Sequence, residues 1–199
     1  MLEEKKMKRT IKDFDLEGKK IIIRCDLNVP IENGVITDDT RIIASLRTIK
    51  YALRFNTKII LLSHLGKIKT EEDKKKNSLY PVAERLREYL NTEVLFSPDT
   101  CSDRLTDMVN SMKEKSVLLI ENTRFEDVPD KRESECNDDL AKYWASLGDI
   151  FINDAYGTCH RNHTSITGIP KYLPSGVGFL VEKELQKIDS VLDAKTHPF

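Results

Sequence analysis

The sequence predicts an α/β fold in which a doubly wound parallel sheet is flanked by helices on both faces. From residue 20 onward, short aliphatic runs alternate with segments whose apolar residues recur every three or four positions. The segments between the runs are long enough for helices of about ten or more residues, which make right-handed crossovers between parallel strands. A length of 199 residues allows one large domain or two small ones.

The first half of the chain supplies three predicted strands and two predicted helices. Polar residues at 37–40 can accept hydrogen bonds from the free N–H groups of a helix start. A second helix opens at Ser78 and has Pro81 in its first turn, where the missing N–H costs little. The strands lie at 21–23, 59–62 and 94–96, and the apolar helix stripes are Ile42, Leu46, Ile49, Leu53 and Leu79, Val82, Leu86, Leu90.

The second half continues the alternation with a helix at 103–112, a strand at 117–120, a helix at 135–147 and a strand at 150–152. Residues 66–77 are dense in Lys and Glu, so we expect a mobile surface loop there. After Asp154, glycines and prolines punctuate a loop-like stretch. A last helix carries the apolar stripe Leu180, Val181, Leu185, Ile188 and Leu192.

Charge and composition exclude several classes of protein. The 32 Lys and Arg nearly balance 33 Asp and Glu, giving a net charge of −1 and no reason to expect a nucleic-acid or membrane-surface partner. The longest aliphatic runs have four residues, whereas a membrane span needs roughly 20. Four scattered cysteines without a CxxC pair fit a reducing cytosol, so we expect a cytoplasmic protein.

Polar and basic side chains follow four of the predicted strands. Ligands of open parallel sheets bind beyond the carboxyl ends of the strands, so these residues should meet at one edge. They are Arg24, Asp26 and Asn28 after the first strand; Ser63, His64, Gly66 and Lys67 after the second; Glu121, Asn122, Thr123 and Arg124 after the fourth; and Asn153, Asp154, Gly157, Thr158, His160, Arg161 and His163 after the fifth.

This set has a positive bias, to which Arg41 at the first predicted helix start adds. Arginine grips carboxylate and phosphate with two parallel hydrogen bonds and stays charged at any relevant pH. The natural ligand is therefore a small polyanion that carries both kinds of group. Asp26 and Asn28 can accept from and donate to its hydroxyl or carboxylate oxygens. The basic members are Arg24, Arg41, Lys67, Arg124, Arg161, His64, His160 and His163.

Plainer interpretations stay open for several of these residues. Arg24 is favoured as structural, paired with a carboxylate such as Asp26 or Asp154, and a lone arginine such as Arg41 in a first helical turn is usually solvated. For His64, a structural role and a ligand contact are equally favoured.

Metal binding and nucleophilic catalysis are both disfavoured. His160 and His163 lack a third metal ligand at helical spacing. Ser63 and His64 are neighbours in a strand and point to opposite faces, and the chain has no GxSxG motif. Neither GxxxxGK[ST] nor a GxGxxG after a strand occurs, so nothing in the sequence is an obvious nucleotide cradle.

Five short motifs occur in order along the chain: IIIRCDLNVP at 21–30, TDDTR at 37–41, LSHLGK at 62–67, ENTRF at 121–125 and NDAYGTCHR at 153–161. Together they resemble the N-terminal half of phosphoglycerate kinase. The resemblance implies the Rossmann-like N-terminal domain of a two-domain hinge kinase, which binds 3-phosphoglycerate.

The resemblance also implies roles for residues of the strand-end set. Asp26 and Asn28 would hold the glycerate hydroxyl and carboxylate end, and Arg41 would bind the carboxylate and, as the catalytic residue, steady the phosphoryl group. The remaining substrate contacts would be His64, Lys67, Arg124 and Arg161, with the arginines mainly on the 3-phosphate. Lys67-Ile68 departs from the usual Arg-Pro and loses the two-pronged guanidinium, which predicts weaker phosphate affinity.

The same resemblance implies a reaction and a domain plan. Phosphate would pass between 1,3-bisphosphoglycerate and ADP, giving 3-phosphoglycerate and ATP in glycolysis. Residues 1–178 would form the phosphoglycerate domain, and 179–199 would form the interdomain helix and the start of a hinge. Mg-ATP or Mg-ADP would bind a C-terminal domain that this sequence does not reach, so we expect the chain alone to be inactive and the full-length enzyme to be a monomer. The alternative is a non-catalytic fragment that binds phosphoglycerate or other anions.

Overall fold

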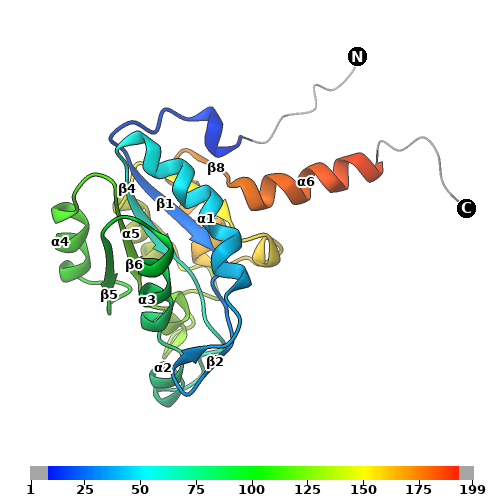
Figure 1. Ribbon diagram of the computed structural model, residues 1–199. Helices are drawn as coiled ribbons and strands as arrows, with labels where there is room; N and C mark the ends of the chain where they lie inside the picture. The colour runs from blue at the N-terminus through cyan, green and yellow to red at the C-terminus, as the bar shows by residue number, and fades with distance from the viewer. Residues whose placement is uncertain (1–8, 193–199) are drawn as a thin grey trace, which may run out of the picture.

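The computed structural model describes residues 9–192, and its centre is a six-stranded parallel sheet (Figure 1). The long helices between successive strands impose the parallel pairing, as the sequence predicts. The strand order is β5 (Val94–Ser97), β6 (Ser116–Ile120), β4 (Lys58–Leu62), β1 (Lys20–Cys25), β7 (Ile150–Asp154) and β8 (Ser175–Val177).

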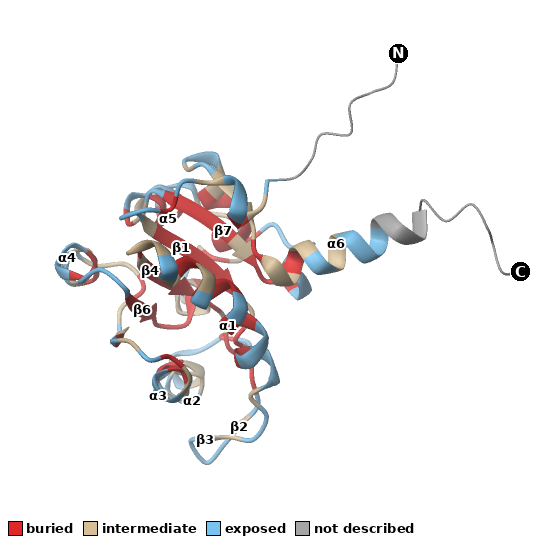
Figure 2. Cartoon of the chain, turned by 45° about the horizontal axis from the view of Figure 1, so that its top comes forward, coloured by how far each residue is buried: buried red, intermediate tan, exposed pale blue. Residues whose placement is uncertain are grey.

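Helices cover both faces of this sheet, and each face has its own apolar core. Because side chains alternate along a strand, Ile21 and Ile23 of β1 pack with α1 (Thr40–Ala52) and α3 (Tyr80–Tyr89). Ile22 packs on the opposite face with α4 (Asp103–Ser111) and α5 (Asp138–Ser146), including the fully buried Trp144. The central strands β6, β4, β1 and β7 are buried between these two layers (Figure 2), which confirms the predicted doubly wound fold.

Shorter elements connect these layers. An antiparallel hairpin follows β1, and its turn uses two residues with positive φ, Asn33 and Gly34. The remaining elements are β2 (Ile31–Glu32), β3 (Val35–Ile36), α2 (Glu71–Lys76), α6 (Phe179–Leu192), the 3₁₀ segments Ile11–Asp13, Leu53–Phe55, Thr123–Asp127, Tyr156–Thr158 and Ile169–Lys171, and one π-helical turn, Thr164–Gly168. No helix of the described chain is long and apolar enough to cross a membrane.

The prediction of a loop throughout residues 66–77 is wrong, because α2 lies inside this stretch. Thr70 Oγ1 accepts a hydrogen bond from the Asp73 amide at 3.3 Å, and Asp73 Oδ2 accepts from the Thr70 amide at 3.0 Å, which is a capping box. Acidic residues in the first turn and lysines in the last suit the helix dipole. Local capping therefore forms a short helix where no apolar stripe exists.

Two further boundaries differ from the prediction. The helix expected at 135–147 begins only at Asp138, because Cys136 adopts a left-handed φ of 55° that no helix contains, and Asn137 caps the helix behind it. The loop-like stretch after Asp154 contains the edge strand β8, which pairs with β7. Its sequence, Ser175-Gly176-Val177, lacks the aliphatic run that marks the other strands.

Helix α6 extends away from the sheet (Figure 1), and its apolar stripe becomes more exposed from Val181 to Ile188. Val181 is buried and Leu185 is half-buried, whereas Ile188 is 44% exposed. The side chain of Leu192 lies outside the described residues. The N-terminal turn of α6 is tied to β7, since Asp154 Oδ1 accepts a hydrogen bond from the Leu180 amide at 2.8 Å.

Candidate functional site

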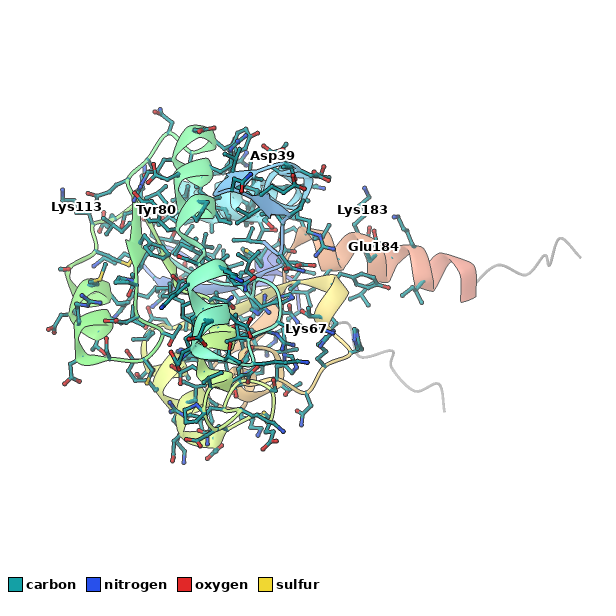
Figure 3. The ribbon with its side chains drawn as sticks, turned by 90° about the horizontal axis from the view of Figure 1, so that it is seen from below. Asp39, Lys67, Tyr80, Lys113, Lys183 and Glu184 are labelled. Carbon is teal, nitrogen blue, oxygen red and sulfur yellow. The ribbon has the colours of Figure 1, made fainter. Side chains whose placement is uncertain are left out.

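The carboxyl ends of β1, β4 and β7 lie side by side and bring the predicted residues to one edge. In the sheet register, Arg24 on β1 pairs with Leu62 on β4 and with Asn153 on β7. The residues after each strand therefore emerge together, as expected for an open parallel sheet. Figure 3 views the domain from below and labels the exposed Lys67, which follows β4.

Asp26 and Arg41 form an ion pair at this edge. Arg41 Nη1 donates to both carboxylate oxygens of Asp26, each at 2.8 Å. The Arg41 side chain is 51% exposed, whereas that of Asp26 is 13% exposed. A side chain at Gly157 would place its Cβ 3.2 Å from Asp26 Oδ2, so glycine leaves room for the carboxylate. The pair holds the Arg41 guanidinium beside the strand ends.

Asn28 shapes the loop that follows β4. Its Oδ1 accepts a hydrogen bond from the Gly66 amide at 2.8 Å. Gly66 has a φ of +61°, and a Cβ there would lie 2.4 Å from Asn77 Oδ1, so only glycine fits. This hydrogen bond fixes the base of the loop that carries Lys67 and leaves the Asn28 Nδ2 amide available for the expected ligand contact.

A buried side-chain cluster lies behind the site, centred on Arg24. Arg24 is fully buried, its Nε donates to Ser165 Oγ at 2.9 Å, and its Nη2 lies 3.1 Å from His64 Nδ1. Ser165 in turn donates to Glu133, another fully buried residue. Among carboxylates, Glu133 has the largest effect in raising the pKa of Arg24, against the lowering caused by burial. Within residues 9–192, Arg24 forms no ion pair with Asp26 or Asp154, so that expected pairing is wrong; Ser165 instead links Arg24 to the Glu133 carboxylate.

Arg124 and Arg161 complete the positive set. Arg124 is mostly buried and lies 3.5 Å from Asp127 through Nη1, and within residues 9–192 its buried Nε has no hydrogen-bond partner. Burial, then Arg24, Arg124 and Arg161, lower the pKa of His64 to about 2. The charges of all three arginines thus oppose protonation of this imidazole, and Arg24 lies in direct contact with it.

The two histidines that follow β7 differ in their surroundings. Burial and the arginines lower the pKa of His163 to about 4, whereas His160 lies exposed. Among the described residues, no group of three or more His, Cys, Asp or Glu side chains could hold a metal ion.

A cavity of about 560 Å³ opens beside Arg124, on the side of the segment that follows β6. The cavity is lined by the cations Lys69, Arg124 and Lys131 and by the carboxylate of Asp127, among other residues. Asp26, Arg41 and His64 are not among its lining residues. The cavity therefore adjoins the predicted site and does not contain it.

Asn122 positions two parts of the site, although the sequence pattern assigned it no role. Its Nδ2 donates to the carbonyls of Leu65 at 2.7 Å and Asn77 at 2.9 Å. Its Oδ1 accepts from the amides of Leu65 at 3.2 Å and Arg124 at 3.1 Å. Ser165 and Glu133 were also missed, because both lie in segments without a strand or a stripe to place them. The only available signal was their chemistry: a buried arginine requires a carboxylate nearby.

Comparison with known proteins agrees with this geometry. The family model described as phosphoglycerate kinase matches residues 11–199. The phosphoglycerate kinase of Enterococcus faecalis is 54% identical over 193 residues, covering 96% of this chain and 49% of its own length. The phosphoglycerate kinase of Listeria innocua is 53% identical over 191 residues, covering 96% and 48%. The chain thus spans about half the length of the curated relatives it matches.

Solved structures show the same fold. Phosphoglycerate kinase from Coxiella burnetii superposes with a TM-score of 0.82 at 33% identity, covering 96% of this chain and 47% of that one. Phosphoglycerate kinase from Pyrococcus horikoshii superposes with a TM-score of 0.81 at 30% identity, covering 95% and 47%. The family model spans nearly the whole chain, and the sequence and structural similarities agree with it. The chain therefore belongs to the phosphoglycerate kinase family.

Proposed function

We propose that this chain supplies the 3-phosphoglycerate site of a phosphoglycerate kinase, which transfers phosphate reversibly between 1,3-bisphosphoglycerate and ADP. The observation that carries the proposal is that the Asp26–Arg41 pair and His64 follow the carboxyl ends of the adjacent strands β1 and β4, with arginine charge acting on the His64 ring. A ligand with a phosphate at one end and a carboxylate or acyl phosphate at the other suits two separate groups of cations. Membership of the family agrees with this choice of ligand.

In this proposal, each residue binds a particular group of the ligand. Arg41 takes the carboxylate and, during transfer, the charge of the moving phosphoryl group, while Asp26 and the Asn28 amide bind the hydroxyl and carboxylate end. Arg124, Arg161 and Lys67 bind the 3-phosphate, with His64 as a neutral contact. Phosphoryl transfer depends mostly on positioning and charge neutralisation, which fixed arginines provide.

The nucleotide belongs, in the proposal, to a second domain of the full-length protein. Residues 1–178 would be the phosphoglycerate domain and 179–199 the start of the connection, of which 193–199 lie outside the described residues. Mg-ATP or Mg-ADP would bind this second domain, in line with membership of the family. A monomeric enzyme in the cytoplasm would fit this glycolytic role.

Ligand-dependent melting tests the proposed site. Bringing arginines to one edge of the sheet costs electrostatic repulsion that a bound anion relieves, so 3-phosphoglycerate should raise the melting temperature. At about 100 times its dissociation constant, the ligand adds roughly 2.7 kcal/mol to the free energy of unfolding. Glycerol 3-phosphate, which lacks the carboxylate, is the matched control and should stabilise less. No shift at saturating 3-phosphoglycerate would contradict the proposal, and equal shifts would support the non-catalytic anion-binding alternative.

A further inference from the structure

The buried charges behind the site form one continuous hydrogen-bonded chain that ends on His64. Glu133 Oε1 accepts from Ser165 Oγ at 2.5 Å, and Glu133 Oε2 accepts from the Ser165 amide at 2.9 Å. Ser165 Oγ accepts from Arg24 Nε at 2.9 Å, and Arg24 Nη2 reaches His64 Nδ1 at 3.1 Å. The chain thus runs from the π-helical turn and the segment before α5 to the loop after β4.

The direction of every hydrogen bond in this chain is set by chemistry. Arginine has five N–H donors and no acceptor, so Arg24 must donate to both Ser165 and His64. The Ser165 hydroxyl, which accepts from Arg24, then donates its single proton to Glu133. His64 Nδ1 has to be the acceptor, and it therefore carries no proton. The neutral imidazole consequently has its proton on Nε2.

Charge balance keeps these hydrogen-bonded side chains in the protonation states just described. Arg24 and Glu133 are both fully buried, and an isolated buried charge is costly, so the guanidinium and the carboxylate compensate each other. His163 Nδ1 lies 3.9 Å from Glu133 Oε1, beyond hydrogen-bond distance, and its lowered pKa leaves it neutral at neutral pH. Arg124 and Arg161 act on His64 from the site and oppose a second proton on its ring.

We propose that Glu133, Ser165 and Arg24 are positioning residues that hold His64 as the neutral Nε2–H tautomer, a fixed hydrogen-bond donor for an anion bound among the arginines. The proposal rests on the proposed function only for the identity of that anion. A neutral donor suits the site because it adds a directed hydrogen bond without adding a further positive charge to the cluster. Outer partners of this kind fix the tautomer of a functional histidine in many sites.

The tautomer is measured first on the unaltered, ligand-free chain, by long-range ¹H–¹⁵N NMR correlation of the His64 ring at neutral pH. We expect a single Nε2–H tautomer with an unprotonated Nδ1. A ring protonated on Nδ1, or a doubly protonated ring, would overturn the proposal whether or not the chain binds 3-phosphoglycerate. This measurement needs no variant to fold and no ligand to bind.

Variants then test whether the hydrogen-bonded chain from Glu133 to His64 contributes to ligand binding. Ser165→Ala removes the hydroxyl between Arg24 and Glu133, and should weaken 3-phosphoglycerate binding by about tenfold in calorimetric titration while mixing the His64 tautomers. Ser165→Thr keeps a hydroxyl and should retain the wild-type affinity and tautomer. Ser116→Ala is the matched control, since it removes another buried serine hydroxyl, at the start of β6.

The outcomes separate a positioning role from a structural one. A loss of stability with an unchanged tautomer and affinity in Ser165→Ala would overturn the proposal, as would an equal loss of affinity in Ser116→Ala. If the unaltered chain binds no 3-phosphoglycerate but His64 shows the fixed tautomer that Ser165→Ala abolishes, the proposed function fails and the inference about the histidine stands. Sulfate then replaces 3-phosphoglycerate as the anion probe in the same titrations.

Discussion

Arg41 is held by Asp26 through one of its nitrogens, which leaves most of its hydrogen-bonding capacity for a ligand. Nη1 donates to both carboxylate oxygens, and the side chain is 51% exposed. A guanidinium has five N–H donors in all, so Nη2 and Nε can still form a two-pronged contact with a carboxylate. Asp26 therefore orients Arg41, and the proposed ligand could bind without breaking the ion pair.

Replacing Arg41 with alanine should weaken 3-phosphoglycerate binding by about 1.5–3 kcal/mol, the usual contribution of a hydrogen bond to a charged group. The circular-dichroism spectrum should not change, because the side chain is half-exposed and outside both cores. Arg104→Ala is the matched control, since Arg104 is 61% exposed, is paired with Asp99 and lies on α4. Calorimetric titration in which both variants bind equally well would remove Arg41 from the site.

A substitution of Lys67 provides a complementary test, because it should preserve or increase the affinity for 3-phosphoglycerate. Lys67→Arg should bind 3-phosphoglycerate as tightly as the wild type or more tightly, since the planar guanidinium adds a second parallel hydrogen bond to phosphate. The Gly66 amide bound to Asn28 fixes the base of the loop in both proteins, so the substitution changes the end group and leaves the backbone in place. A several-fold weaker affinity of Lys67→Arg, measured side by side with wild type, would count against phosphate contact at this position.

Among the elements, α6 depends on a buried carboxylate at its start. Asp154 Oδ1 accepts hydrogen bonds from the amides of Leu180 and Val181, at 2.8 and 3.4 Å. A Cβ at Gly178 would lie 2.3 Å from the same oxygen, so glycine permits the helix to approach β7. Burial outweighs these hydrogen bonds and raises the pKa of Asp154 to about 6. The anchor of α6 is therefore titratable.

This raised pKa predicts how stability should depend on pH. An unfolded aspartate titrates near 3.9, so between about pH 4 and pH 6 the folded state binds more protons than the unfolded state. The contribution of Asp154 is then fully present below about pH 4 and is lost as the pH rises through about 6, by up to about 2–3 kcal/mol. Asp154→Asn keeps the Oδ1 acceptor and removes this titration.

Urea unfolding of both proteins from about pH 4 to pH 7 provides the measurement. The free energy of unfolding of Asp154→Asn, minus that of the wild type, should increase over this range. Asp99 serves as a control of opposite sign, because its hydrogen bond with Arg104 lowers the pKa of Asp99. The same difference for Asp99→Asn should therefore decrease with pH. A pH-independent difference for Asp154→Asn would contradict the buried, titratable anchor.

The elements that the sequence predicted are those that pack apolar side chains into the core. Aliphatic runs identified five of the six strands of the sheet, because a strand covered on both faces needs apolar side chains at every position. Strand β8 is an edge strand with a glycine at its centre, and helix α2 is exposed and held by its capping box. Neither buries an apolar face of its own, so hydrophobic periodicity could not identify them.

At the scale of the whole molecule, sheet topology predicts which residues of the candidate site share one edge, but it does not predict the contacts that residues distant in sequence make behind that edge. The rule for parallel sheets brings Asp26, His64 and Arg124 together from chain positions alone. Arg24 is instead linked to Ser165 and Glu133, which lie more than a hundred residues after it in the sequence. Only the packed structure decides which distant carboxylate compensates a buried arginine.

The two-domain interpretation predicts that these 199 residues alone do not catalyse ATP-dependent phosphorylation of 3-phosphoglycerate. Neither glycine-rich phosphate motif occurs in the sequence, and proximity of bound reactants lowers a barrier by roughly 7–11 kcal/mol, which a freely diffusing nucleotide forfeits. A coupled assay would compare the chain with the phosphoglycerate kinase of Enterococcus faecalis, a relative about twice as long. Binding of 3-phosphoglycerate without turnover is the expected result, and a separately produced nucleotide domain should restore turnover only if it docks. Robust turnover by the purified chain alone would show that the nucleotide site lies within these residues.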